Sequence, residues 1–203
     1  MATTTKATTL AAVNTIISNI GQAPVSNLIS GNPLVETAEN ILHEITRAVQ
    51  AEGWGFNTEY HVTFSPNTTT KHIDVLDDIL SFDTGPHNRD YPQVVMRAGK
   101  LYDLANHTFE FTESLELDVV RLVDFLDMPE AFKNYVTIRA ANVFAGRSVG
   151  SAEAVRFGER EEIFARSTAI EYDTQQNDTN IFADEDYNMT YKGYRPLSTL
   201  QRY

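Results

Sequence analysis

The stretch from Asp127 to Asn177 constrains the fold most, because it predicts two consecutive helices separated by a glycine-containing break. Asp127 can cap the first helix, Pro129 suits its first turn and Glu130 can complete a capping box. Apolar residues then recur at helical spacing, so one face of this 129–149 helix is expected to be buried. That stripe contains Phe132, Val136, Ala140, Val143 and Phe144, and the other faces carry Lys133, Arg139 and Arg147.

The second helix of this hairpin has a different composition. Ser151 and Glu153 can start it, and its apolar positions are few, namely Val155, Ile163 and Ile170. The remaining positions are mostly charged, which indicates a long solvated or subunit-facing helix rather than one at the middle of a core.

Two further helices are predicted near the start of the chain. A threonine pair can cap the first, which Gly21 can end, and the second ends at Gly53. Both have apolar stripes that would pack on the 129–149 helix, so residues 8–57 and 127–177 are expected to form a helical bundle. The stripes contain Leu10, Val13, Ile16, Ile17 and Ile20, and then Leu34, Ala38, Ile41, Leu42, Ile45, Ala48 and Val49.

Residues 58–126 change to strand-like patterns. One strand is predicted where apolar and polar residues alternate, and a hairpin where Ala98 and Gly99 join two short apolar runs. In a later strand the apolar register shifts, which a bulge or burial on both faces explains. We predict an α+β fold: mainly a helical bundle with an inserted antiparallel β-rich region. The alternating positions are Tyr60, Val62 and Phe64 in the first strand, and Leu115, Leu117 and Val119, then Val120 and Leu122, in the later one.

Residues 178–203 lose this periodicity but keep widely spaced aromatic side chains. Such a segment is typical of an extended C-terminal arm that lies on another surface, so the whole chain is interpreted as one domain with an arm. Its aromatic residues are candidates for an oligomer or partner interface, as are two arginines of the 129–149 helix. The candidates are Phe182, Tyr187, Tyr191, Tyr194, Tyr203, Arg139 and Arg147.

Charge and composition exclude several classes of function. The formal net charge of −12 disfavours a nucleic-acid-binding protein, because such proteins hold phosphates with basic surface. The chain has no cysteine, so disulfides and thiolate zinc sites are excluded. No stretch approaches the apolar length of a membrane span or the core of a signal peptide, so we expect no membrane partner.

Candidate chemical sites are weak. The histidines lack the paired spacing of a metal site, and Trp54 is interpreted as a core anchor. Glu159, Glu161 and Glu162 offer the two carboxylates that a glycosidase needs, but any charged helix face offers such pairs. We therefore predict no catalytic, cofactor-binding or metal-binding residues and no cofactor. The histidines are His43, His61, His72, His87 and His107.

Several short motifs occur in a fixed order along the chain. They are Ile20–Val25 (IGQAPV), Gly53–Asn57 (GWGFN), Gly99–Asp103 (GKLYD), Asn106–Phe109 (NHTF), Pro129–Ala131 (PEA) and Asn180–Phe182 (NIF). In this order and spacing they resemble tail tubular protein A of short-tailed podoviruses, from residue 8 to residue 182.

The resemblance implies an adaptor between head and tail, made as a ring of twelve copies. The implied partners are the portal protein and the tail nozzle (tail tubular protein B), with genomic DNA only as passing cargo. The implied location is the neck and tail of the virion, after synthesis in the host cytoplasm. An alternative function is a tail-associated hydrolase of cell-wall or capsular glycan, which rests only on the acidic helix face.

Overall fold

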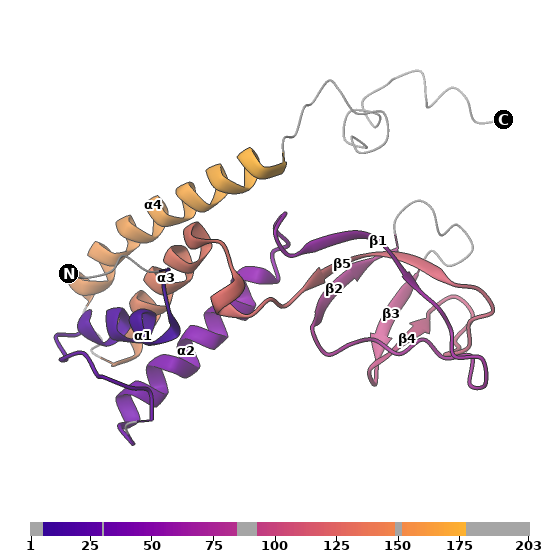
Figure 1. The fold of residues 1–203 in the computed structure, drawn as a ribbon, viewed down its shortest axis with the longest axis horizontal. Helices are drawn as coiled ribbons and strands as arrows, with labels where there is room; N and C mark the ends of the chain where they lie inside the picture. Colours follow the sequence, from indigo (N-terminus) through magenta and orange to yellow (C-terminus); the bar gives the residue numbers. More distant parts are fainter. Residues whose placement is uncertain (1–5, 30, 85–92, 149–151, 178–203) are drawn as a thin grey trace.

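The computed structural model describes residues 6–29, 31–84, 93–148 and 152–177, and it has a helical part and a β part (Figure 1). The predicted α+β class is confirmed, with the strands inserted in the chain between the second and third helices. The predicted C-terminal arm lies outside the described residues. The helices are α1 (Thr9–Ser18), α2 (Pro33–Gln50), α3 (Glu130–Ser148) and α4 (Ala152–Asn177), and the strands are β1 (Thr58–Phe64), β2 (Ile79–Asp83), β3 (Val94–Arg97), β4 (Lys100–Asp103) and β5 (Leu115–Arg121).

The first two helices begin with side-chain caps. Thr8 Oγ1 accepts a hydrogen bond from the N–H of Ala11 (3.2 Å), and Asn32 Oδ1 accepts one from the N–H of Leu34 (3.0 Å). After each helix the chain turns at a glycine with positive φ, as predicted. These are Gly21 (φ 78°) and Gly53 (φ 75°).

The predicted capping box of α3 is wrong. Asp127 is the last residue of η1 (Phe125–Asp127), a short 3-10 helix whose own cap is Asp124. The Glu130 carboxylate accepts from the N–H of Ala7 (3.2 Å) instead of reaching back. The start of the chain therefore lies beside α3 and supplies a donor that local sequence could not indicate.

Lys133 was expected on a solvated face of α3, but it is buried (1% exposed). Its ammonium donates to Glu130 Oε1 at 3.0 Å, and Glu130 itself is half exposed. The long side chain is thus covered while its charge is paired at the edge of the core. This hydrogen bond, and then the one from Ala7, lower the pKa of Glu130.

The centre of the helical part is α3, which contacts α1, α2 and α4 (Figure 1). Its predicted stripe is confirmed at Phe132, Val136, Ala140 and Phe144, which are all in the buried cluster. The α2 stripe is confirmed except at its edge, where Leu34 and Ala48 are exposed.

The contact between α3 and α4 combines small residues with Tyr172, whose ring meets that of Phe132 edge-on with 6.3 Å between centroids. Among the α4 side chains that the structure describes, Ala165 and Ala169 are buried, and a Cβ added to Gly158 would clash with the amide of Asn142 on α3. The larger apolar residues Ile163 and Ile170 point away from α3 and are exposed. Helices that meet through small side chains approach closely, so α4 covers α3 without a large apolar stripe of its own.

In the β part, a three-stranded antiparallel sheet has the order β1-β5-β2, and β3 and β4 form the predicted hairpin. The register shifts in β1 between Glu59 and Val62, where His61 has φ 56°. The predicted alternation therefore fails at Tyr60, which is exposed. A bulge shifts the alternation of side chains between the two faces of the sheet. The position of the bulge in β1 is set by pairing with β5, which the sequence of β1 alone does not show.

Neither feature offered for the register shift of β5 is found as predicted, because the bulges are in its partner strands and the shifted residue Val120 is only half-buried. Leu115, Leu117 and Val119 face the buried cluster of the β part. Bulges lie opposite β5, in β1 and in β2. Val120 points to the other face of the sheet and lies close to Gly53. A Cβ atom added to Gly53 would be 3.4 Å from Val120 Cγ2.

Candidate assembly interface

The connection between the two parts is a joint made of side-chain amides. Asn57 Nδ2 donates to the carbonyls of Gln50 (3.0 Å) and Arg121 (2.8 Å), and Asn57 Oδ1 accepts from the N–H of Trp54 (2.9 Å). Gln50 Oε1 accepts from the N–H of Val123 (2.7 Å), and Gln50 Nε2 donates to the carbonyl of Val123 (2.8 Å). Both amides are buried, so the end of α2 is bonded to the end of β5 without an unmet polar group.

Trp54 fills the joint from the helical side, as predicted for a core anchor. Its indole Nε1 donates to the carbonyl of Val49 (2.7 Å), and its ring meets Phe132 edge-on with 4.9 Å between centroids. The motif Gly53–Asn57 is thereby explained as structure: a positive-φ glycine, a buried aromatic residue and a bridging amide.

A second polar cluster joins the end of α2 to α3 and α4. Arg166 donates to Glu52 (2.7 Å) and to the Tyr135 hydroxyl (2.7 Å), and these two hydrogen bonds raise its pKa. Arg139 also donates to the Tyr135 hydroxyl (3.0 Å), and it lies 3.7 Å from Glu162. Arg139, predicted as an interface residue, is therefore engaged within its own chain.

The other predicted arginine also has a partner. Arg147 and Glu44 form a bidentate pair with two N–O distances of 2.8 Å. The hydrogen bond lowers the pKa of Glu44 and raises that of Arg147, but both side chains are about half exposed. Exposed pairs of this kind contribute little to stability. An interface role for either arginine remains a prediction.

The predicted aromatic interface residues lie outside the described residues. They are Phe182, Tyr187, Tyr191, Tyr194 and Tyr203. Their assignment to an oligomer or partner interface likewise remains a prediction.

The structure extends two apolar positions predicted in this helix, Ile163 and Ile170, into an apolar surface that we call the α4 outer face. It consists of Ile163 (66% exposed), Phe164 (75%) and Ile170 (45%) with Ser167 and Thr168 between them. Charged residues flank it, because the exposed Arg160 and Glu171 lie one helical turn from it on the same side of α4, whereas Arg166 turns inward. The sequence signal was an adjacent Ile-Phe pair in a charged helix, since large exposed apolar residues mark interaction sites.

The hydroxyl groups of the α4 outer face are already satisfied. Ser167 donates to the carbonyl of Ile163 (2.9 Å), and Thr168 donates to that of Phe164 (3.1 Å). One turn later Thr174 donates to the carbonyl of Ile170 (2.8 Å). This face can therefore be covered without leaving a buried donor unpaired, which is the usual cost of burying a polar surface.

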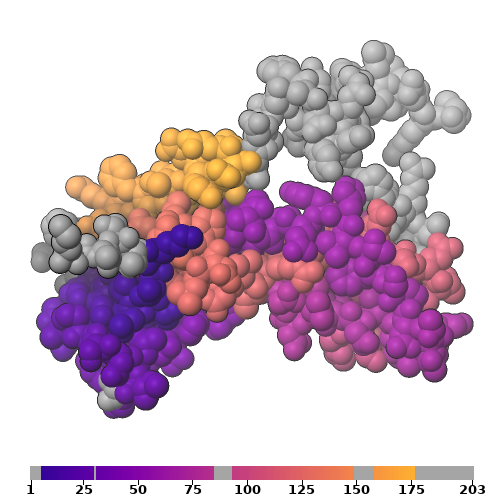
Figure 2. All heavy atoms as spheres, in the orientation of Figure 1, coloured from indigo at the N-terminus to yellow at the C-terminus, as the bar shows by residue number. Residues whose placement is uncertain are grey.

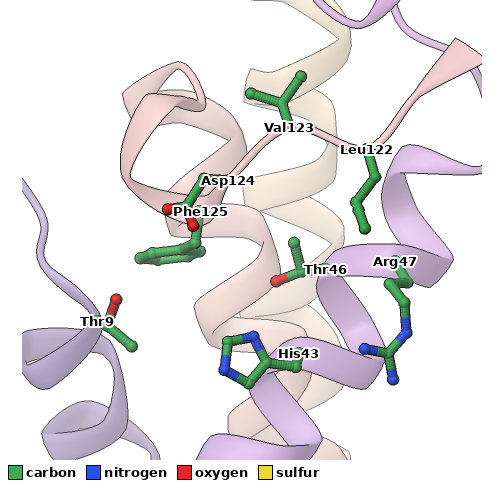
Figure 3. Close-up of a pocket in the computed structure, with 8 residues that line it drawn as sticks. All are labelled: Thr9, His43, Thr46, Arg47, Leu122, Val123, Asp124 and Phe125. Carbon is green, nitrogen blue, oxygen red and sulfur yellow. The ribbon is translucent and has the colours of Figure 1, made fainter. Parts of the chain in front are cut away.

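A hollow of about 350 Å³ lies between the start of α1, the middle of α2 and the segment after β5 (Figure 3). It brings together His43, Arg47 and Asp124, but Asp124 is occupied as the cap of η1. His43 and Thr46 both line it, but the Thr46 hydroxyl donates to the carbonyl of Leu42 (2.7 Å) and not to the imidazole, so this pair is not the hydrogen-bonded nucleophile and base of a catalytic site. The lining residues are Thr9, His43, Thr46, Arg47, Leu122, Val123, Asp124 and Phe125.

The acidic residues considered for glycan hydrolysis do not form a catalytic pair. Glu162 accepts from the Asn142 amide (3.0 Å), whereas Glu159 and Glu161 are exposed. Among the described residues, no three His, Asp or Glu side chains gather as metal ligands.

The geometry alone does not assign the chain to a protein family, but comparison with known families does. The family model described as Tail tubular protein matches residues 10–179, which covers most of the chain. The chain belongs to this tail tubular protein family. It is thus a structural component of a phage tail, and the family is not known for enzymatic activity. No curated protein matches the chain in sequence. None of the helices that the structure describes is long and apolar enough to span a membrane.

Proposed function

We propose that this tail tubular protein is the head-to-tail adaptor of a short-tailed phage, a ring that joins the portal to the tail nozzle. The family match supports a tail component, and the α4 outer face carries the proposal that the subunit works in an assembly. The subunit exposes Ile163 and Phe164 on a helix face whose hydroxyl groups already donate to carbonyls of the same helix. Such a face is suited to a contact that covers it. The whole chain acts as one adaptor domain, and its activity is geometric rather than chemical.

The proposed ring has twelve copies, as in the family that the chain resembles. In a ring, each subunit presents one patch to a different patch on the next, and the rotation closes. The portal and the nozzle protein bind the two ends of the ring. The C-terminal arm, with Tyr187, Tyr191, Tyr194 and Tyr203, is proposed to dock on one of these partners.

The proposed ring surrounds the path of the DNA during ejection. A basic wall would bind the phosphates and hold the duplex, whereas an acidic wall repels it weakly within about 8 Å at physiological salt. The net charge of −12 supports a negative channel face. Glu159 and Glu161 are exposed candidates for it, and the run Asp184–Asp186 lies outside the described residues.

The test is to co-express the full chain with the portal and nozzle proteins of the same genome and to image the purified particles. We expect a ring of the chain between portal and nozzle, with carboxylates lining its bore. Failure of the chain to bind the portal would contradict the adaptor role. A bore lined by lysine and arginine, or tight binding of the purified chain to duplex DNA at low salt, would contradict the negative channel only.

A further inference from the structure

The β part consists of two layers whose outer faces point in opposite directions. One buried cluster lies between the three-stranded sheet and the β3–β4 hairpin, and it contains Leu115 and Leu117 of β5 together with Val94 and Leu101 of the hairpin. Neighbouring residues of a strand point to opposite faces, so the residues next to these four point away from the cluster. We call the two exposed sides the sheet outer face and the hairpin outer face.

The hairpin outer face holds an exposed arginine against an aromatic ring. Lys100 and Tyr102 flank the buried Leu101, and Arg97 is the cross-strand partner of Lys100, so these three side chains share the outer face. Arg97 Cζ lies 4.2 Å from the centroid of the Tyr102 ring, which in turn meets Phe109 edge-on at 4.8 Å. The stacking positions the guanidinium while its N–H groups can still bind a carboxylate in a bidentate manner.

Positive charge exceeds negative charge on the hairpin outer face. Asp74 is bridged to Lys100 on this face, and its carboxylate lies 4.0 Å from the Lys100 ammonium, so these two charges offset each other. Two exposed residues adjoin the face in the chain, Lys71 and Glu110, and they have opposite signs. The charge of Arg97 is therefore left over, in a chain whose net charge is −12.

The sheet outer face has the opposite charge. Glu116 and Asp118 alternate with the buried residues of β5, and Asp83 of β2 lies directly opposite Asp118. Like charges directly opposite each other destabilise a sheet. The nearby cation of β5, Arg121, is already bound to two other carboxylates at 2.7 Å each. His61 lies 3.9 Å from Glu116 but is charged only when protonated, so negative charge remains in excess on this face.

The described helices do not cover the two outer faces. They all lie to one side of the β part (Figure 1), and the β part extends from them as a separate lobe (Figure 2). Arg97 on one face, and Asp83 and Glu116 on the other, are exposed. Both faces are thus accessible to a neighbouring protein.

From this arrangement we infer that the hairpin outer face of one copy binds the sheet outer face of the next copy, with Arg97 against Glu116 and Asp83. The inference rests on the proposed ring and names a contact between its neighbouring subunits. Charge complementarity favours a second copy, because each face offers the charge that the other lacks, and Arg97 would offset the repulsion between the facing carboxylates. The faces point in opposite directions, so two copies cannot make both contacts at once, and the contact repeats from copy to copy as a ring requires.

Charge reversal on the two faces tests this contact in the full chain. Arg97→Glu and Glu116→Arg should each weaken association of the subunits at least about 10-fold, because each change places like charges against each other. The variant with both changes should regain association, because the ion pair is restored with its signs exchanged. Mass photometry of the chain, alone and with the portal protein, measures the association. Both side chains are exposed, so the thermal midpoint should stay unchanged.

The two single changes also separate a specific contact from an effect of total charge. Arg97→Glu makes the chain more negative, whereas Glu116→Arg makes it less negative. General repulsion between acidic subunits predicts opposite effects of the two changes, but the proposed contact predicts a loss from both. Arg47→Glu, at an exposed arginine of α2, is the matched control and should leave association unchanged. Opposite effects, or a double variant that associates no better than the single ones, would overturn the inference.

Cysteine cross-linking gives a measurement that does not depend on charge, because the natural chain has no cysteine. The assembled double variant Arg97→Cys with Glu116→Cys, treated with a bifunctional maleimide, should give a ladder of covalent oligomers beyond the dimer. Neither single variant should give this ladder, and Arg47→Cys with Glu116→Cys controls for random collision. Dimers from a single variant would show a symmetric contact and overturn the inference.

The remaining outcomes separate the inference from the adaptor function. Rings that form on the portal, with no loss from either reversal and no ladder, would overturn the inference while the adaptor function stands. A natural chain that does not assemble with the portal would overturn both. Retardation of duplex DNA at low salt that Arg97→Glu abolishes would assign the hairpin outer face to DNA and overturn the inference.

Discussion

The helical part and the β part differ in what holds them together. In the helical part, one broad cluster of buried side chains from all four helices surrounds α3, and the backbone hydrogen bonds are made within each helix. The β part has a smaller cluster, and its loops depend on polar side chains such as Asp103, which accepts from the N–H groups of Ala105 and Asn106.

The backbone shows the same difference. Among the described residues, all non-glycine residues with positive φ lie in the β part: His61, Lys71, Ala98 and His107. Each such residue costs free energy that surrounding contacts must offset. The comparison teaches that the helical part is the stable support of the subunit, and the β part is held in shape by local bonds and by its joint to α2.

The largest effect should follow from a cavity in the helical core. Phe144 is fully buried, so Phe144→Ala should lower the free energy of unfolding by roughly 3–5 kcal/mol in chemical denaturation. Phe164→Ala is the matched control, because the same truncation on the exposed α4 outer face should change the free energy of unfolding by less than about 0.5 kcal/mol. Equal costs would show that the two phenylalanines do not differ in burial.

A smaller loss should follow from breaking the joint. Asn57→Ala removes the acceptor of the Trp54 N–H and a donor to the Arg121 carbonyl, at a cost of about 1–3 kcal/mol for each buried group that water cannot reach. The Gln50 carbonyl also loses Asn57 but keeps the N–H of Gly53 (3.1 Å). The β part should then unfold before the helical part, so that amide hydrogen exchange should speed up more in β5 than in α3. An equal change in both elements, or an equal loss in the exposed control Asn134→Ala, would argue that the two parts are not joined in this way.

Relief of strain in the β part should be stabilising. Ala98 and Gly99 form the turn of the β3–β4 hairpin with φ values of 52° and 70°, and asparagine adopts this conformation more readily than alanine. Ala98→Asn should therefore raise the free energy of unfolding by up to about 1 kcal/mol. The same change at Ala48, on the exposed side of α2, should instead lower it by about 0.5 kcal/mol.

Acid should act on the β part through Asp103. Burial raises the pKa of this carboxyl, but hydrogen bonds from the Asn106 side chain and from the N–H groups of Asn106 and Ala105 outweigh it, and the pKa lies below 3.8. The ionised form thus stabilises the fold above about pH 4, and this contribution is lost as the pH falls further. Asp103→Asn should show a smaller fall in thermal midpoint between pH 6 and pH 3 than the natural chain. The exposed control Asp74→Asn should show the natural fall.

The helices could be predicted from sequence because their signals are local. The predicted cap at Thr8, the glycine stops and the stripe around Phe144 lie within a few residues of the structures they specify. The cap at Asn32, which was not predicted, is equally local. The hairpin at Ala98 and Gly99 is specified in the same local way.

The errors arose where a distant segment decides. Glu130 bonds Ala7 because residue 7 lies beside the start of α3. The burial of Lys133 is an error of another kind, since its partner Glu130 is one turn away in the same helix. Tyr60 is exposed because β5 sets the register of β1. In α4 the apolar positions were assigned from the large residues Ile163 and Ile170, which are exposed, and the buried Ala165 and Ala169 were not assigned to a stripe.

The amide joint also sets how the subunit transmits force. The chain passes between its two parts at the start of β1 and at the end of β5, and Asn57 and Gln50 bond these crossings together. A pull on the β part is therefore shared between α2, which precedes one crossing, and α3, which follows the other. The force is carried by two connected segments instead of one. To pull the sheet away from the helices, several hydrogen bonds of Asn57 and Gln50 must break at the same time.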